Sequence, residues 1–144
     1  RARTRRGVTA MTVPKVLLVE DSEFMSMRVV DALEAAHDME LTAVKTASEA
    51  RKSLKAESFD VVVVNYELPD ETGIEFAGSL NSSGTDPNVP IILLTGKELE
   101  PIASDAVDNG VTEFVYKGDH AAADMDVLAN RIQTVIAAYG TTAV

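Results

Sequence analysis

Apolar residues along this chain gather in short runs that alternate with segments of helical periodicity. The most uniform run lies at residues 61–64, where four valines precede the polar Asn65, within a strand predicted over 60–65. Uninterrupted β-branched residues are typical of a strand buried on both faces of a parallel sheet. The other predicted strands lie at 15–19, around 41–44, at 89–94 and at 112–116.

The segments between these strands carry helix signals. Apolar residues recur at helical spacing, and Thr followed three residues later by Glu marks the start of two helices, because such a pair satisfies N–H groups of the first turn. The capping pairs are Thr46 with Glu49 and Thr72 with Glu75. The predicted helices run over about 23–36, over about 47–57, from 72 to about 80 with a loop at 81–87, from Pro101 to Asn109–Gly110, and from Asp119 to Gly140.

Five strands alternating with five helices predict an α/β fold with a parallel sheet. Because the connection between parallel strands is right-handed, the helices should cover both faces of one doubly wound sheet. We expect residues 1–14 to be a flexible basic arm, residues 15–139 to be a single folded domain, and residues 140–144 to be a C-terminal tail.

Composition and charge exclude several classes of function. The 144 residues include no cysteine, which excludes disulfides, thiolate zinc sites and cysteine catalysis. Four arginines lie in residues 1–14, so the rest of the chain carries a net charge of −14, against −10 for the whole sequence. Such an acidic surface repels nucleic acid. No apolar run is long enough to span a membrane, and we expect a cytoplasmic protein. Six lysines against 23 acidic residues also favour a halophilic source.

Polar side chains follow four of the predicted strands where each strand ends. They are Glu20 and Asp21 after the first strand, Asn65 after the third, Thr95 after the fourth and Lys117 after the fifth. Ligands of open α/β sheets bind beyond the carboxyl ends of the strands, so these side chains should share one edge. Carboxylate and amide oxygens suit Mg²⁺, and a hydroxyl and an ammonium suit a phosphoryl-like anion. Each residue alone is more often a solvated or capping side chain; their joint placement is the signal.

Over residues 15–139 the sequence resembles the receiver domain of two-component response regulators. The resemblance implies a flavodoxin-like sheet of strand order 2-1-3-4-5 and a phosphorelay signalling module rather than an enzyme. It implies a histidine kinase or other signalling protein as partner, and it allows a homodimer through the face of the fourth helix, fifth strand and fifth helix. The matching residues are Glu20–Asp21 as the acidic magnesium pair, Leu68–Pro69 and Gly73 in the loop after the phosphoacceptor, Thr95 as the switch hydroxyl, Phe114 as the rotating aromatic residue, and Lys117 as the site lysine.

The chain departs from the family pattern at the phosphoacceptor. That aspartate lies four residues before the loop proline, and here the position holds Asn65. A neutral amide is a far poorer nucleophile than a carboxylate, so we expect no phosphorylation of the protein as given. The resemblance implies that Mg²⁺ is held by Glu20, Asp21, Asn65 and the backbone carbonyl of Glu67, and the lost charge should weaken that binding.

Two explanations of Asn65 stay open. It is either natural, which makes the chain a pseudo-receiver, or an introduced Asp→Asn change in an ordinary receiver. Gly96 and Gly118 also depart from the pattern, and Gly118, which replaces a family proline, favours the first explanation. Alternative functions are an interaction or dimerisation module that works without phosphorylation, and a small flavodoxin-like nucleotide-binding protein. The last is disfavoured because no Gly-rich phosphate loop follows the first strand.

Overall fold

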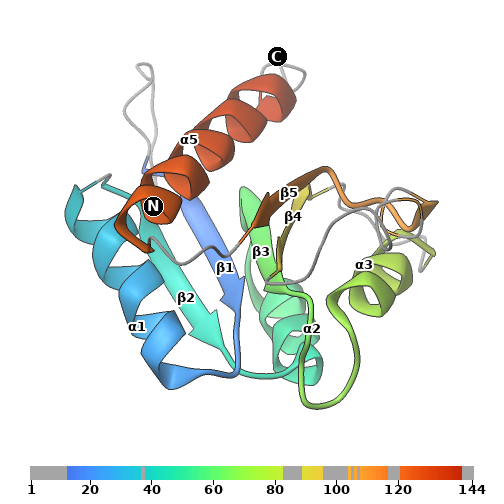
Figure 1. Ribbon diagram of the computed structural model, residues 1–144. Helices are drawn as coiled ribbons and strands as arrows, with labels where there is room; N and C mark the ends of the chain where they lie inside the picture. The colour runs from blue at the N-terminus through green and yellow to red at the C-terminus, as the bar shows by residue number, and fades with distance from the viewer. Residues whose placement is uncertain are drawn as a thin grey trace.

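The computed structural model describes residues 13–36, 38–82, 89–95, 104, 106, 108–116 and 121–140. Five parallel strands form one sheet in the order β2-β1-β3-β4-β5 (Figure 1). This order confirms the predicted flavodoxin-like, doubly wound fold. The strands are β1 (Lys15–Val19), β2 (Glu40–Val44), β3 (Val61–Asn65), β4 (Ile91–Thr95) and β5 (Glu113–Tyr116).

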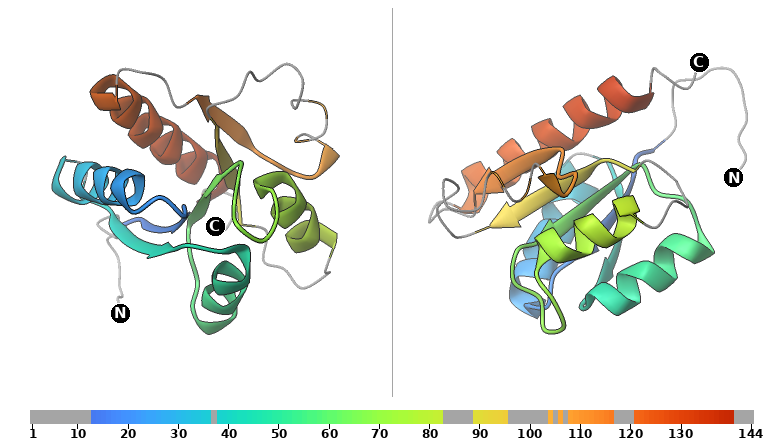
Figure 2. Two further views of the ribbon diagram at one scale, coloured as in Figure 1. Left: turned by 60° about the horizontal axis from the view of Figure 1, so that its bottom comes forward. Right: turned by 90° about the vertical axis from the view of Figure 1, so that its right-hand side faces the viewer.

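Helices cover both faces of the sheet (Figure 2). On one side lie α1 (Glu23–Asp31) and α5 (Ala121–Gly140), and on the other lie α2 (Ala47–Ala56) and α3 (Gly73–Ser82). Successive side chains of a strand point to opposite faces. Val61 and Val63 therefore pack with α1 and α5, while Val62 and Val64 pack with α2 and α3. Burial on both faces explains why this strand is a run of valines.

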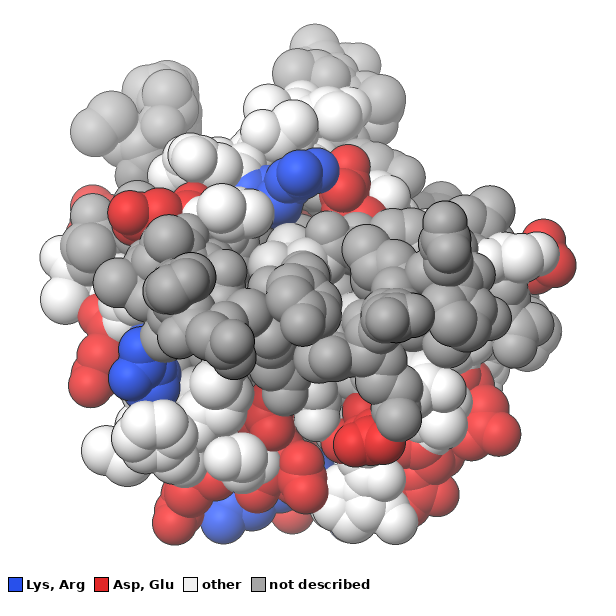
Figure 3. Space-filling view, viewed as in Figure 1, with Lys and Arg blue, Asp and Glu red and all other residues white. Residues whose placement is uncertain are grey.

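The outer surface carries the acidic excess of the sequence. In Figure 3, acidic side chains gather towards the lower end of the molecule, where β1 and β2 end in Figure 1, and few basic side chains lie between them. None of the described helices is long and apolar enough to cross a membrane.

Both predicted capping pairs form. At α3 the pair is reciprocal: the Thr72 N–H donates to Glu75 Oε1 at 3.0 Å, and the Glu75 N–H donates to Thr72 Oγ1 at 3.1 Å. At α2 the Glu49 N–H donates to Thr46 Oγ1 at 3.0 Å, but the Glu49 carboxylate accepts from the N–H of Lys45 at 2.9 Å, one residue earlier than a capping box requires.

The first helix reaches residue 36 as expected, but its end is not regular. After α1 the chain continues as a π-helix, η1, over Ala32–Ala36. Asp38 follows with a φ of 60°, and the Met39 N–H donates to the Leu33 carbonyl at 3.1 Å. A left-handed residue with this backward hydrogen bond is a common helix ending. The sequence hides it, because aspartate rather than glycine takes the left-handed position.

Among the described residues, two boundaries lie two residues away from their predicted positions. The fourth strand begins at Ile91 rather than at residue 89, since Pro90 has no N–H for a sheet ladder. The third helix continues to Ser82 into the expected loop, because no glycine or proline lies between Leu80 and Gly84 to end it. Several predicted segments lie outside the described residues: residues 1–12 of the arm predicted over 1–14, the segment 83–88, most of the fourth helix, residues 117–120 and residues 141–144.

Phe76 gives a direct test of the packing between α3 and the sheet. Its side chain is fully buried, so Phe76→Ala should lower the free energy of unfolding by about 3–5 kcal/mol. Phe24 on α1 is 70% exposed, and Phe24→Ala should change it by no more than about 0.5 kcal/mol. Urea unfolding of both variants measures the difference. An equal loss of the free energy of unfolding in Phe76→Ala and Phe24→Ala would contradict this packing.

Candidate functional site

Three polar side chains are buried among the described residues, and all lie where neighbouring strands end. Glu20 directly follows β1, Asn65 ends β3 and Thr95 ends β4. Their exposed fractions are 2%, 6% and 0%. The parallel registers of β1 with β3 and of β3 with β4 place these three side chains at one edge of the sheet. Asp21 follows Glu20 and is exposed to solvent.

The structure describes the other predicted residues less fully. Glu67 lies in the loop after β3 with its side chain exposed. Phe114 lies in β5, where its backbone pairs with that of Leu93. Lys117 lies outside the described residues, as do Gly96 and Gly118.

The start of α1 holds the Glu20 carboxylate in place. Glu20 Oε2 accepts the Ser22 N–H at 3.0 Å, and Ser22 Oγ in turn accepts the Met25 N–H at 3.2 Å as the N-cap of α1. The positive end of the helix dipole favours a carboxylate at this position. The Glu20 carboxylate is therefore held at the sheet edge, where its oxygens could serve as metal ligands.

Asn65 turns its amide nitrogen towards the loop that follows it. Asn65 Nδ2 donates to the backbone carbonyl of Glu67 at 2.6 Å. That carbonyl oxygen is the one that the family resemblance assigns to the metal. The side chain at residue 65 thus presents a hydrogen-bond donor where a receiver presents a carboxylate.

Gly73 allows α3 to begin directly behind the end of β3. A Cβ at residue 73 would lie 2.5 Å from the backbone oxygen of Asn65 and 2.9 Å from Leu93 Cδ1, which no side chain tolerates. The Gly73 N–H donates to the Tyr66 carbonyl at 2.7 Å and closes the loop on itself. The glycine is therefore needed for close approach of two backbones.

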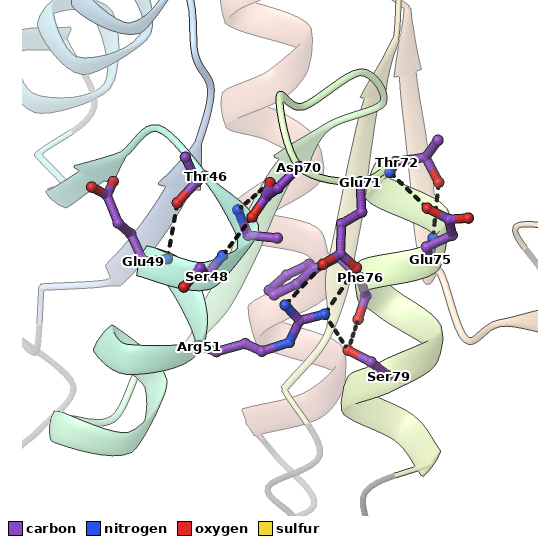
Figure 4. A network of polar contacts seen from close by, with 11 residues as sticks. Thr46, Ser48, Glu49, Arg51, Asp70, Glu71, Thr72, Glu75, Phe76 and Ser79 are labelled. Atoms are coloured by element: carbon purple, nitrogen blue, oxygen red, sulfur yellow. Dashed lines mark hydrogen bonds and ion pairs between the residues drawn. The ribbon is translucent and has the colours of Figure 1, made fainter.

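Two acidic side chains fasten the same loop to α2 (Figure 4). Asp70 Oδ1 and Oδ2 accept the N–H groups of Ala47 and Ser48, each at 3.1 Å. Arg51 donates to both carboxylate oxygens of Glu71, at 2.9 and 2.8 Å. We call these contacts the α2 clamp. They bind two consecutive loop residues to the first turns of one helix.

The α2 clamp shifts the pKa values of Asp70 and Arg51. Loss of hydration acts to raise the pKa of Asp70, but the hydrogen bonds from the backbone N–H groups of Ala47 and Ser48 outweigh this effect and leave the pKa below the ordinary value. The hydrogen bond to Glu71 raises the pKa of Arg51, while burial opposes the increase. Both groups are therefore held in their charged forms.

The edge matches only part of the metal site that the resemblance implies. Glu20 and Asp21 supply hard oxygen ligands of the kind that Mg²⁺ prefers. Asn65 directs nitrogen rather than oxygen at the Glu67 carbonyl. Within the described ranges, no three acidic or histidine side chains gather in a way that could hold a metal ion. Of the ligands that the resemblance implies, only the two carboxylates of Glu20 and Asp21 therefore suit a metal ion as the side chains lie.

The fold and this edge define an α/β module whose ligand site lies beyond the carboxyl ends of a parallel sheet. A model of the response regulator receiver domain matches residues 16–132, and the chain belongs to that family. It is therefore a receiver domain of two-component signalling.

Two curated relatives place the match in longer proteins. The regulatory protein VirG of Agrobacterium fabrum is 35% identical over 103 residues, which cover 71% of this chain and 39% of that protein. The swarming motility regulation protein RssB of Serratia marcescens is 29% identical over 102 residues, which cover 71% of this chain and 45% of that protein. The chain spans less than half the length of these relatives.

Solved structures of receivers share the fold. The chemotaxis response regulator CheY4 of Vibrio cholerae gives a TM-score of 0.74 at 25% identity, with 84% of this chain and 99% of that chain covered. The receiver domain of the Francisella response regulator 1452 gives 0.77 at 20% identity, with 88% and 98% covered.

The α2 clamp is the feature of this edge that the sequence did not reveal. Asp70 and Glu71 read as exposed loop acids, and Arg51 reads as a helix-surface residue. The partners lie about twenty residues apart in sequence, a separation at which neither capping rules nor helical periodicity applies. Only the packing of α2 beside α3 brings them together.

Asp70 should make the stability of the domain depend on pH in acid. A folded-state pKa below the ordinary value means that Asp70 stabilises the fold fully above about pH 3.9, the unfolded value, and that this contribution is lost as pH falls through the folded value. Asp70→Asn should lower the free energy of unfolding by about 0.5–1 kcal/mol at pH 7, as the loss of an exposed helix cap does. Urea unfolding from pH 7 to pH 2 measures both quantities.

Asp31→Asn, which changes the same charge at an exposed position of α1, is the control. The difference in the free energy of unfolding between the native protein and Asp70→Asn should disappear in acid. The difference between the native protein and Asp31→Asn should not shrink in this way. A gap of constant size across the pH range would show that the Asp70 carboxylate does not form the clamp.

Proposed function

We propose that this receiver domain transmits signals through protein contacts without accepting a phosphoryl group at residue 65. The observation that carries the proposal is the identity and environment of Asn65. It ends the central strand, it is 6% exposed, and its amide nitrogen faces a backbone carbonyl.

The chemistry of the acceptor supports this function. In phosphoryl transfer to a receiver, an anionic oxygen forms a bond to phosphorus while the bond from phosphorus to the donor breaks. The attacking oxygen, the phosphorus and the leaving atom of the donor must lie in line. The lone pairs of an amide are delocalised, and its oxygen carries no full charge. Asn65 is therefore a poor nucleophile even when a donor binds well.

Three carboxylates near residue 65 already have hydrogen-bond partners, which opposes their use as a replacement acceptor. Both oxygens of Asp70 are engaged by the N-terminus of α2. The Glu71 carboxylate is held by Arg51. Glu20 accepts from Ser22, and it lies at the end of β1 rather than of β3. These three carboxylates therefore do not compensate for the loss of the acceptor at residue 65.

We extend the proposal to the cofactor. Mg²⁺, when bound, would supply positive charge beside an incoming phosphoryl group. Glu20 and Asp21 are the residues of this chain that would hold it. Asn65 and the Glu67 carbonyl, the neutral ligands that the family resemblance adds, would join them only if the Asn65 amide gave up its hydrogen bond to that carbonyl and turned its oxygen to the metal. Binding should be weaker than to three carboxylates, because each lost charge reduces the attraction.

The partners follow from the family. Receivers act with histidine kinases and other signalling proteins, and we propose such a protein as partner in the cytoplasm. The sensor kinase/phosphatase CqsS of Vibrio cholerae matches over 119 residues at 27% identity, 82% of this chain but 17% of that protein. A homodimer through the face of helix four, β5 and α5 is a second mode of contact.

Intact-protein mass spectrometry after treatment with acetyl phosphate and Mg²⁺ tests the proposal. The native chain should gain no phosphoryl adduct. Asn65→Asp should gain one, and the adduct should be acid-labile. The double variant Asp21→Asn, Asn65→Asp should label less, because it loses a metal ligand. A stable adduct on the native chain would overturn the proposal. Failure of Asn65→Asp to label would mean that a second departure, such as Gly118, also disables the site.

A further inference from the structure

The hydrogen bond from Asn65 to Glu67 occupies the position of a metal contact. An octahedral Mg²⁺ site places neighbouring ligand oxygens about 2.9 Å apart, given metal–oxygen distances of about 2.0–2.1 Å. Asn65 Nδ2 lies 2.6 Å from the Glu67 oxygen. The amide nitrogen thus lies at about the separation from this carbonyl that a second ligand oxygen would have, but it directs an N–H group at the carbonyl.

A cation and this amide therefore compete for one carbonyl oxygen. To coordinate a metal beside Glu67, the Asn65 amide must rotate so that Oδ1 replaces Nδ2. Rotation breaks the hydrogen bond, and without a cation it would set two partial negative charges against each other. The buried position of Asn65 makes an unsatisfied group costly.

The rest of the loop is held without any metal. The α2 clamp fixes Asp70 and Glu71 from one side. The Leu68 N–H donates to the Glu71 carbonyl at 3.2 Å, and Glu67 forms a bridge with Thr72. These contacts do not hold the backbone between Asn65 and Glu67. The position of that short segment therefore depends on whether residue 65 donates a hydrogen bond to it or binds a metal.

We infer that the Asn65 amide does the structural work of the cation, holding the loop after β3 in one metal-independent conformation. This takes from the proposed function only the assignment of residue 65 to the acceptor position. A carboxylate at this position cannot donate to Glu67 and would add a negative charge beside Glu20. Only a chain with such a carboxylate needs Mg²⁺ to offset the repulsion between residue 65, Glu20 and the Glu67 carbonyl.

Thermal unfolding in EDTA and in millimolar MgCl₂, with no phosphodonor present, tests this inference. In EDTA, Asn65→Asp should melt about 3–6 °C below the native protein, because it loses a hydrogen bond and gains a repelling charge. Mg²⁺ should recover most of that loss in Asn65→Asp and should leave the native melting temperature unchanged. Asn65→Ala should melt lower than native in both buffers, since it lacks the donor and gains no metal ligand.

Asn130→Asp makes the same chemical change at an exposed position on α5 and serves as the control for net charge. Its melting temperature should not respond to Mg²⁺. A native protein that gains as much stability from Mg²⁺ as Asn65→Asp does would overturn the inference. So would an Asn65→Asp variant that melts at or above the native protein in EDTA.

NMR of the native protein tests the same inference without any variant. The Asn65 side-chain amide should show a scalar coupling across its hydrogen bond to the Glu67 carbonyl carbon, and the coupling should persist when MgCl₂ is added. Loss of the coupling with Mg²⁺ would show that the cation displaces the amide. A phosphoryl adduct on Asn65 of the native chain would refute the proposed function, while a coupling that persists in MgCl₂ would still support this inference, so the two failures are distinguishable.

Discussion

Burial of β3 on both faces fixes the position of the candidate site. Its four valines have no exposed surface, and the helices on the two sides pack against alternate members of the run. A shift of one residue would exchange the two faces and move Asn65 away from the sheet edge. The strand therefore holds Asn65 beside Glu20 and Thr95, and the helix that follows must begin at Gly73, where the backbones meet.

The loop after this strand is stabilised from two directions. Its outer part is attached to α2 through the bidentate ion pair of Arg51 with Glu71, whose side chains are only 34% and 20% exposed. The exposed pair of Lys45 with Glu23, at 3.4 Å, should contribute little by comparison. The inner part is attached through Asn65. The first attachment does not depend on residue 65, which is why a change there should alter the loop locally rather than unfold it.

Sequence reasoning succeeded where the determinants are local. Uninterrupted apolar runs identified β1, β3 and β4, and Thr72 with Glu75 identified the start of α3. The shared edge of Glu20, Asn65 and Thr95 followed from parallel strand order. It failed at the end of the first helix, where Asp38 takes a conformation that glycine usually takes. It also missed the α2 clamp, which joins residues distant in sequence. The orientation of the Asn65 amide depends on one carbonyl two residues away, a relation that residue types alone do not determine.

A crystal structure of the native protein grown in excess MgCl₂, at a resolution that distinguishes the amide by its hydrogen-bond partners, tests the role of Asn65 most directly. We predict that Asn65 Nδ2 remains within hydrogen-bond distance of the Glu67 carbonyl, with any cation held by Glu20 and Asp21. A cation bound jointly by Asn65 Oδ1 and the Glu67 carbonyl would contradict that role and would show that the native site binds metal as an ordinary receiver does.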